Sequence, residues 1–267
     1  LVVGYQQAKL QHARAERTTD RAVQVIDEIY GHFAPNPVVS TQFDSQLEGE
    51  LEPSSLEQMP ISANTALLLE GLLSFYDDFA EESHDSDAVI AKAVSANRRV
   101  GDIHRRLDQR DEARLSYLRA IDRIEGLPES HQQRLEIRLE LARIYNGLGL
   151  SMMRSAWENS RERLAAHQQA VDLLDRPDAT PMEQFELATS LYLLHTAEWR
   201  LQRVARWRQR RRGDVEVLKS NAKSHLQKAK EILTSLTHNV ESEQYQLLLA
   251  RCLLADADTL CQVCDEE

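Results

Sequence analysis

The chain has 267 residues, of which 28% are charged, and its formal net charge is −11. This acidic balance argues against general affinity for nucleic acid, because a surface that binds phosphates normally carries an excess of basic residues. Nine glycines and seven prolines leave few positions for turns, and no segment alternates valine or isoleucine with polar residues as a strand does. The composition therefore predicts an all-α protein with long helices, in one large domain or two small ones.

Residues 1–33 predict a helix behind a short apolar end. The apolar residues Leu1 to Tyr5 are too few to cross a bilayer, which takes about 20 apolar residues. Two interpretations stay open: the start of a soluble helix, or the trimmed end of a membrane span followed by a juxtamembrane helix. No signal peptide is expected, because no charged segment precedes an apolar stretch of the needed length.

Residues 34–61 predict a long connection without regular helix. Four prolines interrupt any helical hydrogen-bond pattern in this segment, namely Pro35, Pro37, Pro53 and Pro60. Helix is expected to resume at Ser62, a candidate N-cap. The apolar residues of 67–82 cover more than one face, which predicts a helix that is covered on both sides.

Residues 94–127 carry the clearest repeat pattern and predict two short helices folded back on each other. Small residues such as Gly101 and Ala113 allow two helix backbones to approach closely. Large residues such as Tyr117 fill the remaining seam. This order of small and large residues over about 34 residues resembles one tetratricopeptide repeat. Asp108 stands where that family usually has a turn glycine.

Further copies of the pattern are expected near 141–177 and 187–236, with a partial copy from 245. The third copy has His195 at the glycine position, and it contains an insertion that predicts an elongated or interrupted hairpin. In the partial copy, Leu249-Ala250-Arg251 echoes Leu141-Ala142-Arg143. Residues 62–267 are therefore predicted to form a right-handed superhelix of antiparallel hairpins, each of which buries its apolar face on the next.

A wider resemblance joins these segments. LLLEGLLSFYDDFAEE, ANRRVGDIHRRL, EARLSYLRAI and LARIYNGLG, in that order, resemble the C-terminal region of membrane-anchored serine/threonine protein kinases of planctomycete-type bacteria. The resemblance covers nearly the whole chain and is most specific in residues 67–124. It implies a kinase domain and one transmembrane helix upstream of Leu1. The long connection 34–61 and the arginine-rich insertion depart from the family pattern.

Motifs for catalysis are missing from the sequence. It contains no glycine-rich phosphate loop, kinase signature, HExxH or serine elbow. Cys261 and Cys264 form one CxxC pair, which supplies half of a four-ligand zinc site, so a redox pair or metal clip stays open beside ordinary helix composition. His104, His167 and His195 fall at helix-packing positions and are interpreted as structural. We therefore predict a chain that is not an enzyme and uses no cofactor or metal.

Binding is the expected activity, because the first helices of tetratricopeptide stacks line a groove. Equivalent positions of successive first helices form three columns: Arg98, Asn146 and Tyr192; Arg105, Met153 and Trp199; and Arg106, Arg154 and Arg200. Aligned arginines would concentrate positive potential in the groove, and each can bind a carboxylate or phosphate with its planar fork. The sequence thus predicts a groove for an extended acidic or C-terminal peptide. The alternative is that these arginines pair with neighbouring acidic residues and only solubilise the face.

The segment EWRLQRVARWRQRRRG has seven arginines between Arg200 and Arg212, with Trp199 and Trp207 among them. It predicts an elongated amphipathic helix with a basic outer side. Contact with nucleic acid or an anionic membrane surface is one interpretation. A solvated helix or a contact with a partner protein are the others.

Together these patterns predict a protein-interaction or sensor region of a larger serine/threonine kinase, which binds a protein or peptide and relays a signal to the kinase. The repeats would be extracytoplasmic, on the opposite side of the membrane from the kinase, and the membrane would be reached only through a segment before Leu1. Self-association is a further expectation. The alternatives are a stand-alone cytoplasmic scaffold and a nucleic-acid binder that uses helix 200–212.

Overall fold

The computed structural model describes residues 87–152, 159–207 and 212–264, and every regular element in these ranges is an α-helix. The all-α prediction is therefore confirmed for this part of the chain. The predictions for 1–33, for the connection 34–61 and for the helix from Ser62 fall outside the described residues. The same is true of Met153, of Arg154 and of residues 208–211 within the arginine-rich segment.

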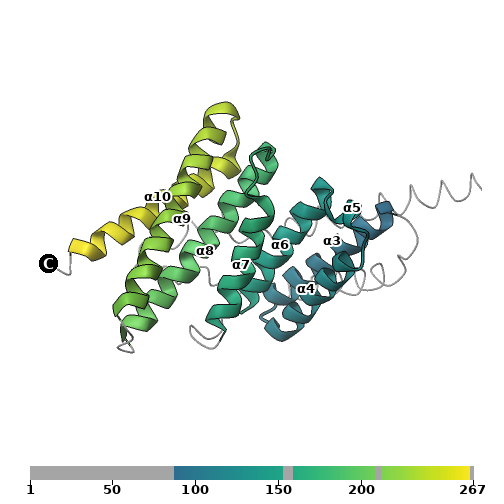
Figure 1. Ribbon diagram of the computed structural model, residues 1–267, viewed down its shortest axis with the longest axis horizontal. Helices are drawn as coiled ribbons and strands as arrows, with labels where there is room; N and C mark the ends of the chain where they lie inside the picture. The colour runs from purple at the N-terminus through teal and green to yellow at the C-terminus, as the bar shows by residue number, and fades with distance from the viewer. Residues whose placement is uncertain (1–86, 153–158, 208–211, 265–267) are drawn as a thin grey trace, which may run out of the picture.

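Three hairpins follow one another along the molecule (Figure 1). The helices are α3 (Asp87–Arg106), α4 (Arg110–Glu125), α5 (Glu129–Gln132), α6 (Leu135–Ser151), α7 (Ser160–Leu174), α8 (Pro181–Trp207), α9 (Arg212–Asn239) and α10 (Glu243–Cys264). α3 packs on α4, α6 on α7 and α8 on α9. The first hairpin contacts the second through α4 and α6, the second contacts the third through α7 and α8, and α10 packs on α9. The long helices α8 and α9 show that the third hairpin is elongated.

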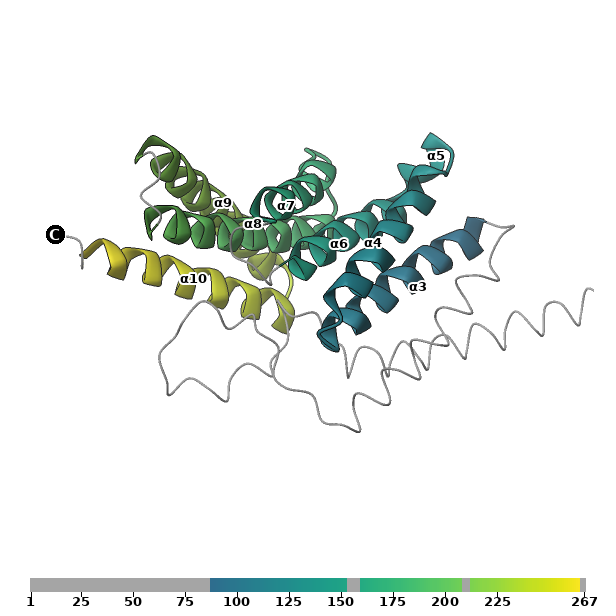
Figure 2. The same cartoon turned by 90° about the horizontal axis from the view of Figure 1, so that it is seen from below.

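The first helices of the hairpins also contact one another, α3 against α6 and α6 against α8. We call α3, α6 and α8 the first-helix layer. Figure 2 shows α6 and α8 side by side, with α7 and α9 on one side of them. This layer gives the predicted site residues a common setting, because seven of the nine lie on its three helices within the described ranges.

Tyr117 is the centre of the first hairpin. Its ring is fully buried, and its hydroxyl donates a hydrogen bond of 2.6 Å to Asp102 Oδ1. An ideal Cβ on Gly101 of α3 or on Gly147 of α6 would lie 2.6 Å from the ring. The predicted close approach at Gly101 is thus present, and Gly147 allows the same ring to reach the next hairpin.

The same contact recurs in the other hairpins with different side chains. In the second hairpin, His167 lies against Gly149, where a Cβ would be 2.6 Å from the imidazole ring. In the third hairpin the sizes are reversed: His195 lies on the first helix, and its Nδ1 is 2.8 Å from the carbonyl oxygen of Ala222 on the second. The histidine at the glycine position is therefore accommodated because a small residue faces it.

Buried apolar side chains form two clusters. One combines α3, α4 and α6 with Ala166 of α7, and the other combines α6 to α10 and includes Leu191, Leu226 and Leu248. The sequence echo in α10 proves misleading: Ala142 is fully buried, whereas Ala250 is exposed. The buried positions of α10 are Leu248 and Cys252 instead, since these residues face α9 and α8.

The start of α8 is fixed by local chemistry. Thr180 Oγ1 accepts a hydrogen bond from the Glu183 backbone N–H, and the Glu183 carboxylate accepts one from the Thr180 backbone N–H at 2.9 Å. This reciprocal capping box satisfies two backbone donors that a helix start otherwise leaves unpaired. Pro181 follows at the first helical position, where its missing N–H costs nothing.

The turn between α3 and α4 explains why the usual residue there is glycine. Asp108 has φ 60°, in the left-handed region. The backbone N–H groups of Asp108 and Gln109 donate to the carbonyl oxygens of Arg105 and His104, at 3.1 and 2.8 Å. These two bonds form a Schellman motif, which closes the end of a helix and favours glycine at the left-handed residue.

We expect Asp108→Gly to raise the free energy of unfolding by up to about 1 kcal/mol and Asp108→Val to lower it by at least about 1 kcal/mol, because a β-branched side chain clashes in the left-handed conformation. Urea unfolding followed by circular dichroism measures both. Arg110→Gln is the control for the exposed Asp108–Arg110 ion pair of 2.7 Å, which should contribute little. Wild-type stability in Asp108→Val would contradict the prediction.

Candidate partner-binding face

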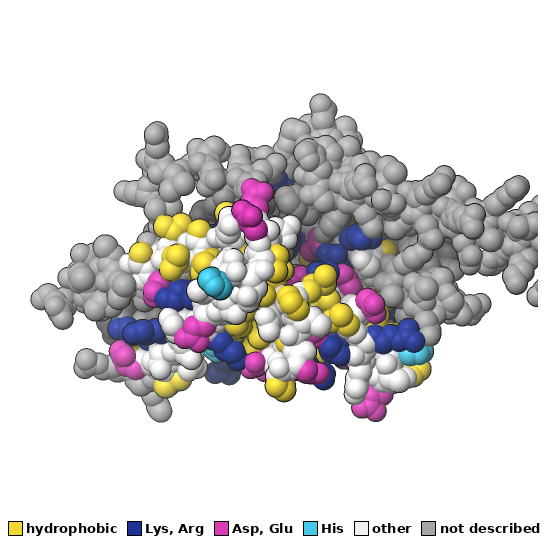
Figure 3. Space-filling view, turned by 90° about the horizontal axis from the view of Figure 1, so that it is seen from above, with side chains coloured by type: hydrophobic (Ala, Val, Ile, Leu, Met, Phe, Trp, Pro, Cys, Tyr) yellow, Lys and Arg dark blue, Asp and Glu magenta, His cyan; other side chains and the backbone are white. Residues whose placement is uncertain are grey.

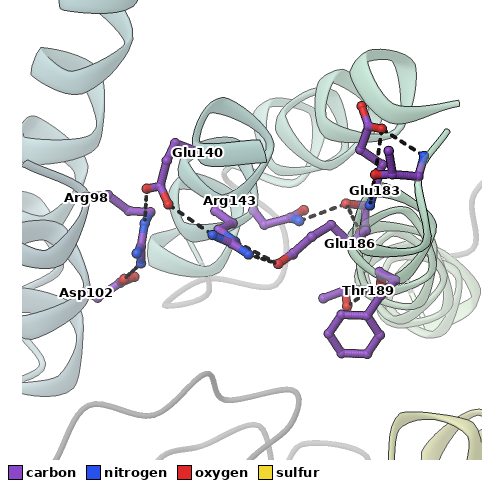
Figure 4. Close-up of polar contacts among 11 residues, drawn as sticks. Arg98, Asp102, Glu140, Arg143, Glu183, Glu186 and Thr189 are labelled. Atoms are coloured by element: carbon purple, nitrogen blue, oxygen red, sulfur yellow. Dashed lines mark hydrogen bonds and ion pairs between the residues drawn. The ribbon is translucent and has the colours of Figure 1, made fainter. Parts of the chain in front are cut away.

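Charged side chains link the three helices of the first-helix layer. Arg98 of α3 donates from Nη1 to Asp102 at 2.6 Å and from Nε to Glu140 of α6 at 2.7 Å. Arg143 of α6 donates to Glu140 at 3.0 Å and to Glu186 of α8 at 2.7 Å. Figure 4 shows these side chains in a line across the three helices. We call this set of five residues the cross-helix ladder.

Two members of the cross-helix ladder, Glu140 and Arg143, have shifted pKa values, and both shifts favour the charged form. Burial raises the pKa of Glu140, but Arg98 and Arg143 outweigh it, and the net result is a pKa of about 2. Burial lowers the pKa of Arg143, but Glu186 and Glu140 outweigh it and raise the pKa overall. The ladder is therefore a set of ion pairs at neutral pH, and it ties α3, α6 and α8 together.

A second link runs parallel to the ladder. Arg138 of α6 contacts Glu183 of α8 at 2.5 Å, and Glu183 also caps its own helix through Thr180. Burial raises the pKa of Glu183, but the hydrogen bonds from Arg138 and Thr180 together lower it by more, so that the net shift is downward. One carboxylate thus fixes both the start of α8 and the position of α8 against α6.

Behind the ladder lies a buried line of uncharged polar groups. Asn146 Nδ2 donates to Ser190 Oγ at 2.8 Å, and Asn146 Oδ1 lies 3.1 Å from His167 Nδ1. The amide oxygen can only accept, so His167 donates from Nδ1. Burial first, and Arg163 second, lower the pKa of His167 to about 3. His167 is therefore neutral, and it lies at a helix-packing position, as the sequence pattern predicts.

The residues of the first two predicted columns do not share one environment in the structure. Arg98 belongs to the cross-helix ladder, and Arg105 lies 3.8 Å from Asp102, so both arginines have carboxylate partners. Asn146 and Trp199 are only 6% and 7% exposed, and Tyr192 is half-buried. The expected exposure is wrong for Asn146 and Trp199, because both side chains are buried, and Asn146 contacts His167 of α7 and Ser190 of α8.

Two arginines of the third predicted column, Arg106 and Arg200, lie within the described residues. Arg106 and Arg200 are both half-buried, at the C-terminal end of α3 and in the last part of α8. Arg106 Nε is buried and has no hydrogen-bond partner in the structure. Burial, followed by the neighbouring Arg105, lowers the pKa of Arg106. The end of α3 therefore carries a positive charge that the described carboxylates do not balance.

The sequence columns missed the carboxylates that complete the ladder. Glu140 and Glu186 occupy the same place in a repeated Glu-Leu-Ala segment, at 140–142 and 186–188. In both copies the alanine is fully buried, so the glutamate two residues before it lies at the edge of the helix interface. This repeated tripeptide is the signal that could have identified them.

The described part of the face seen from above has no dominant sign of charge (Figure 3). Figure 3 shows basic and acidic side chains intermixed with hydrophobic ones over the described part of the face seen from above. A broad phosphate-binding surface needs basic residues gathered together. This face therefore does not support the nucleic-acid interpretation. The side chains of 206–214, where the arginine-rich segment continues, lie outside the described residues.

Few groups suited to metal or redox chemistry come together in 87–152, 159–207 and 212–264. No cluster of three or more His, Cys, Asp or Glu side chains with metal-binding geometry occurs there. Burial raises the pKa of Cys252 to about 12, which keeps the thiol protonated. The side chains of Cys261 and Cys264 are outside the described residues, and the CxxC prediction stays a prediction.

None of the helices within the described ranges is both long enough and apolar enough to cross a membrane. The candidate face thus combines two features: the ion pairs of the cross-helix ladder and, at the end of α3, Arg106, whose charge no described carboxylate balances. No protein-family model, curated protein or solved structure matches this chain.

Proposed function

We propose that this chain is a tetratricopeptide-like interaction region that binds an extended acidic peptide of a partner along the first-helix layer. The arrangement of α3, α6 and α8 supports this proposal, because each of these first helices contacts the next. The cross-helix ladder makes that face rigid, and a preorganised surface loses less entropy when a ligand binds.

The observation that carries the acidic preference is the state of Arg106. Its Nε has no hydrogen-bond partner, and its neighbour Arg105 repels it. A carboxylate of a bound peptide would supply the missing acceptor and the missing negative charge. The ladder arginines contribute less to acidic selectivity, since Glu140, Glu186 and Asp102 already neutralise them.

The proposal includes a larger parent protein. The sequence resemblance to receptor-type serine/threonine kinases supports an upstream kinase domain, to which peptide binding would be relayed through a change in assembly. An apolar run of about 20 residues immediately upstream of Leu1 would support membrane anchoring and an extracytoplasmic position for these repeats. A polar run there would favour the stand-alone scaffold.

The binding proposal is tested with a fluorescently labelled peptide rich in Asp and Glu and with a peptide in which these residues are replaced by Asn and Gln. We expect the full chain to bind the acidic peptide in fluorescence anisotropy and to bind the neutral peptide much more weakly. Arg106→Gln should weaken binding of the acidic peptide about tenfold, because a hydrogen bond to a charged group contributes about 1.5–3 kcal/mol.

Arg119→Gln is the matched control, because Arg119 is an exposed arginine on α4, outside the first-helix layer. This variant changes the net charge by the same amount and should bind the acidic peptide like the wild type. Equal losses in both variants would show that the attraction is unspecific. No binding by the wild type would remove the proposed function.

A further inference from the structure

Arg163 occupies a position that is apolar in the other two hairpins. It lies one helical turn before His167 on α7, and the corresponding residues are Ala113, one turn before Tyr117, and Ala222, one turn before Leu226. Ala113 is fully buried, and Arg163 is itself only 2% exposed. A charged side chain at such a position costs several kcal/mol unless a partner of opposite charge is present.

No carboxylate of the described residues pairs with Arg163. Its Nε and Nη2 atoms are both buried and make no hydrogen bond in the structure. These two nitrogens form one edge of the guanidinium group, the edge that holds a carboxylate or phosphate with two parallel bonds. A buried arginine with one complete edge unused is rare, because buried polar groups are nearly always hydrogen-bonded.

Arg143 shows how the same edge is used elsewhere in this chain. Its Nε and Nη2 lie 2.7 and 2.6 Å from Oε1 of Glu186. Arg143 is far more exposed than Arg163, with a side chain 34% accessible, and still has its carboxylate. The more deeply buried arginine is the one without a carboxylate.

The surroundings of Arg163 disfavour its charged form, so that a bound anion would stabilise it. Burial first, and Arg200 of α8 second, lower the pKa of Arg163 to about 10. His167, one turn along α7, is neutral because its pKa is about 3. Two cations therefore influence each other here without a described carboxylate that pairs with Arg163.

We propose that Arg163 anchors a buried oxyanion-binding site between α7 and α8, where its Nε and Nη2 atoms receive a carboxylate or phosphate group. This site is distinct from the proposed peptide-binding face, since Arg163 lies on a second helix. It would exist whether or not an acidic peptide binds to α3, α6 and α8.

The test is thermal unfolding of the full chain in inorganic phosphate or in acetate, with chloride added to keep the ionic strength constant. A ligand that binds only the folded state raises its stability. We expect Tm to rise by about 3 °C when the better anion is present at ten times its Kd. The two anions distinguish a phosphate site from a carboxylate site.

Arg163→Met should abolish this rise and should unfold at the same or a higher temperature than the wild type in chloride alone, because it removes an unpaired buried charge. Arg163→Lys keeps the charge but lacks the two-nitrogen edge, and it should bind the anion at least about tenfold more weakly in calorimetry. Arg119→Gln, an exposed arginine on α4, should respond like the wild type.

Two results would overturn the site. One is a wild-type Tm that does not change with either anion. The other is an Arg163→Lys variant that folds and responds to the anion as strongly as the wild type. Since no peptide is involved, these results are independent of the outcome for the proposed peptide-binding face.

Discussion

Gly147→Ala is expected to lower the free energy of unfolding by about 1–3 kcal/mol, the usual cost of overpacking a core. The new methyl group would lie 2.6 Å from Tyr117 Cζ. The ring cannot retreat toward α3, because it already packs closely on the backbone of Gly101, where an ideal Cβ would also lie only 2.6 Å from it. The loss should exceed the gain of about 1 kcal/mol that alanine normally brings to a helix interior.

A second variant shows whether Tyr117 is the cause. In a Tyr117→Leu background the ring is absent, and Gly147→Ala should become neutral or stabilising. Urea unfolding of the four proteins of this double-mutant cycle measures the change of sign. Gly126→Ala is the control, since its new Cβ would lie at an ordinary distance of 3.5 Å from Asp122 O. An equal cost of Gly147→Ala in both backgrounds would contradict this explanation.

Glu140→Ala is expected to lower the free energy of unfolding by about 1.5–3 kcal/mol, because it removes the charged hydrogen bonds that join Arg98 to Arg143 and leaves these arginines only Asp102 and Glu186 as partners. The matched control is Glu162→Ala. Glu162 forms an exposed ion pair with Arg114 at 3.2 Å, and such pairs contribute less than about 1 kcal/mol. A similar loss in both variants would show that the cross-helix ladder does not hold the layer together.

The lowered pKa of Glu140 predicts that the stability of the protein depends on pH in acid. The pKa of Glu140 falls from 4.5 in its unperturbed form to about 2 in the folded protein, because Arg98 and Arg143 outweigh the effect of burial. Its contribution is therefore fully present above pH 4.5 and is lost as the pH falls toward 2, with an upper limit of about 3 kcal/mol. Wild type should lose stability over this range more steeply than Glu140→Gln. Parallel pH curves would contradict the assignment.

The hairpins were predictable from sequence because their determinants are local. The order of small and large residues in 94–127 placed α3 and α4 and the buried positions Ala113, Tyr117 and Ile124. The Thr180–Glu183 capping box shows the same principle at the start of α8, since a cap depends on residues three positions apart. The repeat predicted near 141–177 overlaps α6 and α7, although α6 begins earlier, at Leu135.

The candidate site was less predictable, because the contacts that link α3, α6 and α8 join residues more than 40 positions apart. Alignment of the repeats placed Arg98 beside Asn146, but the stagger of the helices places Arg98 beside Glu140 and Asn146 beside Ser190. The third predicted column aligned arginine with arginine, whereas ion pairs require carboxylates on the neighbouring helix. Only the packing of α3, α6 and α8 brings these groups together.

The sequence by itself determined an acidic, all-α chain of paired helices, because helix periodicity and the sizes of residues at helix crossings depend on spacing along the chain. The tertiary structure decided which arginines are paired and which are not. Arg143 and Arg163 look alike in the sequence, but one faces Glu186 and the other faces Arg200. Burial and the sign of the nearest charge depend on the neighbouring helix, and this is why an arginine acquires its role only in the folded protein.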